Sequence, residues 1–138
     1  MDYDDNINIA IIDDEQSLCR SMSRLLRASH LWPVTYESAE EFLDDPVQEA
    51  FDCIVLDIQL GGMSGLELHQ RLIASGNHTP VIFITAHDEA EIYNQAQQAG
   101  CYGYYRKTDA SADILKAIAG AVALRRKGMA KRINGSSS

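Results

Sequence analysis

The sequence predicts an α/β domain with a doubly wound parallel sheet. Five apolar runs have the composition of β-strands: residues 7–12, 33–36, 53–56, 81–84 and 103–105. Their starts are 26, 20, 28 and 22 residues apart, and each interval has room for one strand and one helix. The first, third and fourth runs are continuous aliphatic stretches, which is typical of central strands covered by helices on both faces. A chain of 138 residues with 46% hydrophobic side chains fits one such domain.

Helical signals fill the first two intervals. The first interval carries an apolar stripe at helical spacing, formed by Leu18, Met22, Leu25 and Leu26. The second helix is expected at residues 38–45, because Ser38 and Glu41 form a capping-box pattern and Pro46 closes the segment.

Three further helices and a tail complete the predicted domain. The third helix is expected to begin near Ser64 and to end at Gly76, whereas the fourth, at residues 88–99, has only a thin apolar stripe. The fifth helix buries the apolar side chains of Ile114, Leu115, Ile118 and Val122. We expect one domain over residues 1–126, followed by a linker or flexible tail over residues 127–138.

Charge and composition exclude several classes of protein. Residues 1–57 carry a net charge of −11 and residues 58–138 a net charge of +3, which gives −8 for the chain. Such an acidic domain is a poor nucleic-acid binder, so we interpret the basic stretch at residues 125–132 as the cationic end of a helix followed by a solvated tail. No apolar run is long enough for a membrane span, and the acidic N-terminus is unlike a signal peptide. The three cysteines, Cys19, Cys53 and Cys101, lack metal-ligand spacing and fit a reducing, cytoplasmic compartment.

Acidic side chains follow two of the predicted central strands. Asp13 and Asp14 come directly after the first strand, and Asp57 follows the third. If these strands are neighbours, the three carboxylates converge at one edge of the sheet and repel one another unless a cation is present. Oxygen ligands suit a hard cation, so the pattern predicts a Mg²⁺ or Mn²⁺ site. Helix capping is the alternative, but it accounts for Asp14 alone.

The last two strands end in residues that suit a phosphoryl group. Thr85 follows the fourth strand with a hydroxyl, and Lys107 follows the fifth with an ammonium group. Together with a divalent cation, these groups would neutralise a phosphoryl group carried by a carboxylate.

Taken together, the motifs resemble the receiver domain of bacterial two-component response regulators over residues 6–126. The matching stretches are Ile11-Ile12-Asp13-Asp14-Glu15, Val55-Leu56-Asp57, Met63-Ser64-Gly65-Leu66-Glu67, Ile84-Thr85-Ala86 and Arg106-Lys107. The resemblance implies a flavodoxin-like (βα)5 three-layer sandwich with sheet order 2-1-3-4-5.

The resemblance also implies roles for residues at the site. Asp57 would accept a phosphoryl group from a histidine kinase, and Mg²⁺ would be bound by Asp14, Asp57 and the backbone carbonyl of Gln59, with Asp13 contributing through water. The remaining roles fall to the phosphoryl-binding residues Thr85, Ala86 and Lys107, the switch pair Thr85 and Tyr104, and Gln59 and His87 as residues that tune the phosphoryl lifetime.

The partners implied are those of a regulatory module rather than an enzyme acting on other molecules. They are a sensor histidine kinase, a second copy bound in the phosphorylated state through the face of the fourth helix, fifth strand and fifth helix, and a C-terminal DNA-binding output domain. The run Thr85-Ala86-His87-Asp88-Glu89 resembles the group with a LuxR-type helix-turn-helix output. Neither membrane association nor direct nucleic-acid binding by this domain is expected.

The sequence departs from the family pattern at two loops. Thr108 stands where most members have proline after the lysine, so we predict a trans Lys107–Thr108 bond, since a cis bond before a non-proline residue costs roughly 3–4 kcal/mol. Leu60-Gly61-Gly62 stands where Met-Pro is common, which predicts a looser loop after Asp57.

Three other functions remain open at this stage. A Mg²⁺-dependent phosphohydrolase with Asp57 as nucleophile would need a general acid, which in the haloacid-dehalogenase type lies two residues later, where this chain has Gln59. A flavodoxin-like binding module would need a phosphate-binding loop after the first strand, and none is present. A pseudo-receiver that acts by binding alone is the third.

Overall fold

A computed structural model describes residues 6–47, 50–86 and 89–135, with side chains in the last helix described as far as Gly128. A five-stranded parallel sheet has the order β2-β1-β3-β4-β5. Its strands are β1 (Asn8–Ile12), β2 (Trp32–Tyr36), β3 (Cys53–Asp57), β4 (Val81–Thr85) and β5 (Gly103–Arg106). Each lies within one residue of its predicted bounds, and both the fold class and the strand order are confirmed.

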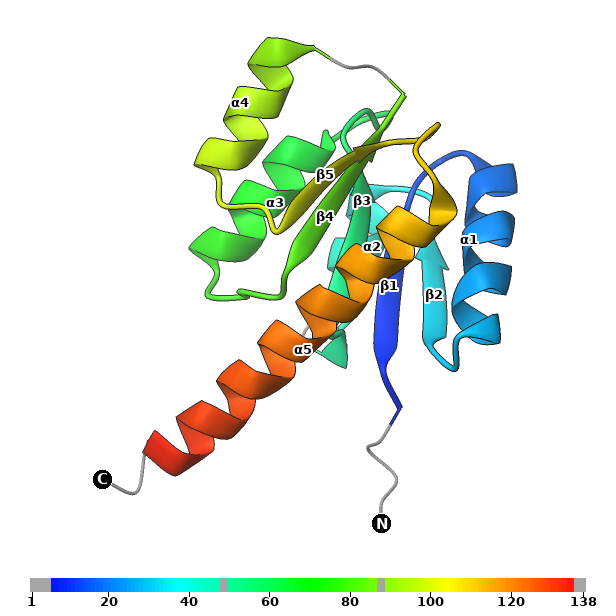
Figure 1. Ribbon diagram of the computed structural model, residues 1–138. Helices are drawn as coiled ribbons and strands as arrows, with labels where there is room; N and C mark the ends of the chain where they lie inside the picture. The colour runs from blue at the N-terminus through cyan, green and yellow to red at the C-terminus, as the bar shows by residue number, and fades with distance from the viewer. Residues whose placement is uncertain (1–5, 48–49, 87–88, 136–138) are drawn as a thin grey trace.

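Helices cover both faces of the sheet (Figure 1). Their bounds are α1 (Gln16–Ala28), α2 (Ala39–Asp44), α3 (Gly65–Ala74), α4 (Ala90–Gln98) and α5 (Ser111–Gly135). On one face, α1 and α5 pack on the sheet through a cluster that includes Leu26 and Ile118. On the other, α2, α3 and α4 pack through a second cluster that includes Phe42, Leu72 and Ala96. This alternation exposes the carboxyl ends of all five strands at one edge of the sheet.

Two helices begin with the serine caps that the sequence indicates. The Ser38 hydroxyl accepts a hydrogen bond from the Glu41 N–H at 3.0 Å, and the Ser64 hydroxyl accepts one from the Glu67 N–H at 3.1 Å. Each cap satisfies a backbone donor that the first helical turn leaves without a partner. The Ser64 cap matters for the site because it fixes where α3 begins after β3.

The last helix is longer than expected. α5 continues to Gly135 through the segment predicted to be a linker or tail, so the helix does not end near residue 126. Lys, Arg, Met and Ala dominate this stretch and are strong helix formers, which offsets the cost of about 1 kcal/mol for Gly128 inside a helix. The domain boundary at residue 126 stays a prediction.

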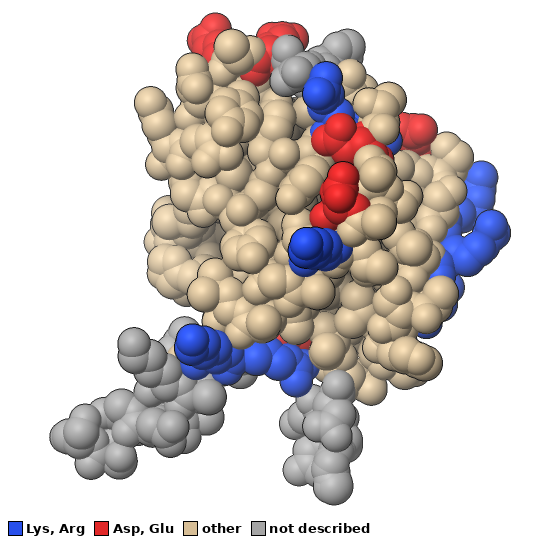
Figure 2. Space-filling model, viewed as in Figure 1, with Lys and Arg blue, Asp and Glu red and all other residues tan. Residues whose placement is uncertain are grey.

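Arg126 fastens this helix to the amino end of the sheet. Its Nε and Nη2 atoms donate to the two carboxylate oxygens of Asp52 at 3.1 and 3.0 Å, and Nη2 also donates to the Asn6 carbonyl at 2.9 Å. Lys and Arg side chains gather around the lower part of α5 and over α1 in Figure 2.

No helix in the described part of the chain is long and apolar enough to cross a membrane.

Candidate functional site

The predicted acidic cluster is present at the carboxyl ends of β1 and β3. Asp13 and Asp57 are almost fully buried, at 2% and 4% exposure, whereas Asp14 is exposed. Each of the three offers a carboxylate oxygen that lies within 4.8 Å of the other two. β1 and β3 pair directly, so the condition for the predicted convergence is met and the backbone ladder brings Asp13 and Asp57 together. The geometry and the all-oxygen donor set fit a hard divalent cation.

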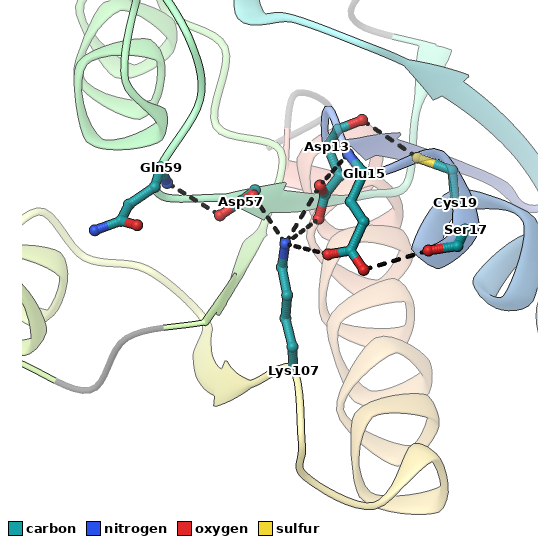
Figure 3. Close-up of polar contacts among 7 residues, drawn as sticks. All are labelled: Asp13, Glu15, Ser17, Cys19, Asp57, Gln59 and Lys107. Atoms are coloured by element: carbon teal, nitrogen blue, oxygen red, sulfur yellow. Dashed lines mark hydrogen bonds and ion pairs between the residues drawn. The ribbon is translucent and has the colours of Figure 1, made fainter.

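Lys107 reaches this cluster from the end of β5 (Figure 3). Its Nζ atom lies 3.1 Å from a carboxylate oxygen of each of three residues: Asp13, Glu15 and Asp57. The side chain is only 17% exposed, so these ion pairs are partly shielded from solvent. One ammonium group therefore serves three carboxylates, and Asp14 adds a fourth negative charge nearby.

Burial and the neighbouring charges shift the pKa values of Asp13 and Lys107. The pKa of Asp13 is raised to about 6, mainly by burial and also by the charge of Asp57, against the lowering effects of the Glu15 N–H and Lys107. Burial would lower the pKa of Lys107, but hydrogen bonds to Glu15 and Asp57 outweigh it and raise that pKa above its ordinary value. Lys107 thus stays a cation, but its single positive charge does not balance the charges of the carboxylates around it.

Backbone geometry fixes Asp57 at the start of the loop to α3. The Gln59 N–H donates to Asp57 Oδ1 at 3.0 Å, and the Gly65 N–H donates to the Ile58 carbonyl at 2.9 Å. A Cβ atom at Gly65 would lie 2.2 Å from the Asp57 carbonyl oxygen, so only glycine allows α3 to begin this close to β3. Figure 3 shows the Gln59 side chain directed away from Asp57. Its backbone, rather than its amide group, faces the acidic cluster.

The two loops that depart from the family pattern are both held by acidic side chains. The Lys107–Thr108 bond is trans, as predicted, and Asp109 closes the turn by accepting from the Arg106 N–H at 2.8 Å. In the other loop, Gly62 has a φ of +80°, and Glu40 Oε2 accepts a hydrogen bond from the Met63 N–H at 2.9 Å. The loop after Asp57 is therefore tied to α2 rather than unsupported.

Two of the remaining predicted residues, Thr85 and Tyr104, lie on the last two strands. Thr85 ends β4 and is buried, and its carbonyl accepts a hydrogen bond from the Lys107 N–H at 2.9 Å. Ala86 follows it and is exposed. Tyr104 is half-buried on the α2–α4 face, with its ring edge-on to Tyr93 at 5.1 Å between centroids. His87 lies outside the described residues.

Sequence reasoning gave no role to two carboxylates at this site. Glu15 directly follows Asp13 and Asp14, so its place in the motif was the available signal for its contact with Lys107. Glu40 has no such signal, because its contact depends on how α2 packs against the loop after β3. Cys19 is buried beside the cluster, and its pKa is raised to about 11, mainly by burial, so it stays a thiol.

Comparison with known families identifies the chain. The family model described as the response regulator receiver domain matches residues 9–119, which include the acidic cluster, Thr85 and Lys107. The chain belongs to this receiver-domain family. The expected resemblance is thereby confirmed.

The curated relatives include a transcriptional regulatory protein and a response regulator protein. The chain is 36% identical over 119 residues to the transcriptional regulatory protein TdiR of Thauera aromatica, covering 86% of this chain and 52% of TdiR. It is 34% identical over 116 residues to the response regulator protein TmoT of Ectopseudomonas mendocina, covering 84% of this chain and 53% of TmoT. The receiver domain thus spans about half the length of the curated relatives it matches.

Solved structures show the same fold. The response regulator StyR superposes with a TM-score of 0.88 at 29% identity, covering 96% of this chain and 67% of StyR. FixJ-N superposes with a TM-score of 0.73 at 27% identity, covering 85% of this chain and 94% of FixJ-N.

Proposed function

We propose that this receiver domain is a phosphorylation switch in which Asp57 accepts a phosphoryl group from a sensor histidine kinase. The observation that carries the proposal is the buried Asp57 carboxylate, which shares one ammonium group with Asp13 and Glu15 at the open edge of the sheet. Such a site holds more negative charge than its own residues neutralise. It is built to take up a cation and, with it, a phosphoryl group.

The cation site would be formed by the carboxylates of Asp13, Asp14 and Asp57 and the backbone carbonyl of Gln59. The three carboxylates already lie within 4.8 Å of one another, which supports Mg²⁺ or Mn²⁺ as the ion. When bound, the ion neutralises charge on the carboxylates and on the phosphoryl oxygens.

In the transfer step, a carboxylate oxygen of Asp57 attacks the phosphorus atom of the kinase phosphohistidine. The P–N bond breaks as the P–O bond forms, and the histidine leaves as a neutral imidazole after taking up a proton. Lys107 would exchange its contact with the Asp57 carboxylate for one with a phosphoryl oxygen, as the Thr85 hydroxyl and the Ala86 N–H bind the others. Gln59 and His87, which stand two positions after Asp57 and two positions after Thr85 in the sequence, would tune the phosphoryl lifetime.

The response to phosphorylation would pass through Thr85 and Tyr104. A phosphoryl group adds charge and acceptor oxygens, which would draw the Thr85 hydroxyl toward it. Tyr104 lies on the adjacent strand and packs edge-on against Tyr93 of α4, so a change of its rotamer would alter the surface formed by α4, β5 and α5. We infer that this surface pairs two phosphorylated copies.

The wider protein would be a cytoplasmic transcription regulator. This is supported by relatives about twice as long as the receiver domain, whose names describe transcriptional regulatory proteins. A C-terminal DNA-binding output domain of the LuxR type would then read the state of the receiver, which itself would act on no other substrate.

The test is the intact mass of the protein after incubation with acetyl phosphate and Mg²⁺. The wild type should gain one phosphoryl group, and the gain should vanish without Mg²⁺ or in Asp57→Asn. Glu67→Gln, which removes an exposed carboxylate on α3, is the matched control and should gain as the wild type does. A folded wild type that gains no mass would contradict the proposal, and so would an equal gain in Asp57→Asn.

A further inference from the structure

The loop from β3 to α3, residues 58–64, supplies one proposed ligand of the cation, the Gln59 carbonyl. The carboxylate ligands stand on β1 and β3 or directly after them, where paired strands hold the backbone in place. The loop instead contains Gly61 and Gly62, which restrict the backbone least of all residues. At its base it is closed by the hydrogen bond from the Gly65 N–H to the Ile58 carbonyl. Its far side needs another restraint.

Glu40 on α2 supplies this restraint. Its Oε2 atom accepts a hydrogen bond from the Met63 N–H at 2.9 Å. The same oxygen would lie 2.8 Å from a Cβ atom at Gly62, so the carboxylate is packed directly against the loop backbone. This hydrogen bond lowers the pKa of Glu40 below its ordinary value, so the acceptor is charged at neutral pH and the contact is a charge-assisted one.

We propose that Glu40 is a positioning residue for the divalent cation: by holding Met63 it fixes the loop and, through it, the Gln59 carbonyl. The inference rests on the proposed function, because it concerns the same cation site. Glu40 lies on α2 and is not part of the acidic cluster at the ends of β1 and β3. It therefore acts on the cation site only through the backbone of residues 59–63. Loss of the contact should therefore weaken one ligand and leave the three carboxylates in place.

The experiment measures Mn²⁺ affinity from the electron paramagnetic resonance signal of the free ion. Glu40→Ala and Glu40→Asp should bind about tenfold more weakly than the wild type, a typical effect of removing an outer-shell partner. Glu40→Asp keeps the charge but is one methylene too short to reach Met63. Glu40→Gln should stay within about twofold of the wild type, because its amide oxygen can accept the same hydrogen bond.

Two controls separate the hydrogen bond from charge and from folding. Glu67→Gln removes an exposed carboxylate from the first turn of α3, where its partner is Arg71 rather than the loop, and should leave the affinity unchanged. Hydrogen exchange at the Met63 amide should quicken in Glu40→Ala and Glu40→Asp but not in Glu40→Gln. If Glu40→Ala does not fold, Glu40→Asp decides.

The outcomes distinguish the inference from the function on which it rests. A wild type that binds no Mn²⁺ would overturn the proposed cation site itself. If Glu40→Asp bound Mn²⁺ as tightly as the wild type does, the proposed role of Glu40 would be overturned, but the cation site would not be affected. Equal weakening in Glu40→Gln and Glu40→Ala would also overturn it, because the effect would then follow charge rather than the hydrogen bond.

Discussion

Strand β3 has a buried aspartate at each end, and the two have opposite surroundings. Asp52 directly precedes the strand and is 6% exposed, whereas Asp57 ends it and is 4% exposed. Asp52 has its own cation, because Arg126 binds both of its carboxylate oxygens and the Asn8 N–H donates a third hydrogen bond at 3.1 Å. Asp57 must share Lys107 with Asp13 and Glu15.

This difference shows how one residue type on one strand serves structure at one end and chemistry at the other. At the amino end of the sheet, Arg126 and Asp52 match in charge and in geometry, since a guanidinium group and a carboxylate form two parallel hydrogen bonds. At the carboxyl end, the number of carboxylates exceeds the number of ammonium groups. The first arrangement stabilises the fold, and the second creates a demand for a ligand.

The largest effect is expected from Gly65→Ala, which tests whether backbone packing, rather than charge, holds the carboxyl end together. The new Cβ would meet the Asp57 carbonyl oxygen at 2.2 Å, so α3 must move away from β3. Overpacking of this kind should lower the free energy of unfolding by about 3 kcal/mol. Urea denaturation measures the change. Unaltered stability would mean that the close approach is not required.

Asp52→Asn should destabilise the domain by about 2 kcal/mol. The substitution leaves the Arg126 guanidinium group without its charged partner. Because the arginine side chain is 39% exposed, water partly solvates its charge and reduces the loss of stability. The free energy of unfolding from urea denaturation is again the measure. Arg126→Lys is a useful companion variant, because it keeps the positive charge but loses the two parallel hydrogen bonds. It should therefore keep only part of the stability that the wild-type pair provides. If Asp52→Asn were as stable as the wild type, the Arg126–Asp52 pair would not stabilise the fold.

In the absence of divalent cations, Asp57→Asn should raise the free energy of unfolding, whereas Asp52→Asn should lower it. Removal of one of the carboxylates that share Lys107 relieves repulsion, and the Gln59 N–H keeps an acceptor on the amide. We expect the metal-free free energy of unfolding to rise by about 1 kcal/mol, as happens when a functional site gives up strain. A loss of stability as large as that of Asp52→Asn would show that the two ends of β3 do not differ.

A pH dependence is also expected at the carboxyl end, and its upper limit is about 3 kcal/mol, because a shift of one pKa unit corresponds to about 1.4 kcal/mol. The pKa of Asp13 is raised from 3.8 to about 6 in the folded state. Between these values the folded state binds more protons than the unfolded state, so Asp13 makes the metal-free domain less stable as the pH rises from about 4 to about 6. The comparison of wild type with Asp13→Asn across this range isolates the contribution. If the two stability profiles differed by a constant amount, the pKa of Asp13 would not be raised.

The sequence predicted the carboxyl end of the sheet well. The spacing of the apolar runs fixed the strands, and residues that directly follow strands must meet at one edge once the strands are parallel. Asp13, Asp14, Asp57 and Lys107 therefore lie together, because their positions depend only on the sheet. Thr85 ends β4 for the same reason.

Contacts that depend on helix packing could not be predicted in this way. Asp52 and Arg126 are 74 positions apart, and they meet only because α5 continues past residue 126 and turns its arginine toward the amino end of β3. Glu40 reaches Met63 across the gap between α2 and the loop after β3, which no local pattern indicates. The basic stretch at residues 125–132 was interpreted as the cationic end of a helix, but residues 127–138 were still assigned to a linker or tail; α5 continues to Gly135 because propensity summed over the segment favours a helix despite Gly128.

The most direct test of the difference between the two ends of β3 is the shift in melting temperature that millimolar Mg²⁺ produces. A ligand that binds only the folded state stabilises it by mass action. The wild type should gain thermal stability, Asp52→Asn should gain as much from a lower starting point, and Asp57→Asn should gain little. An equal shift in Asp57→Asn and the wild type would contradict the account, because the excess of carboxylates at Asp57 would then not form the cation site.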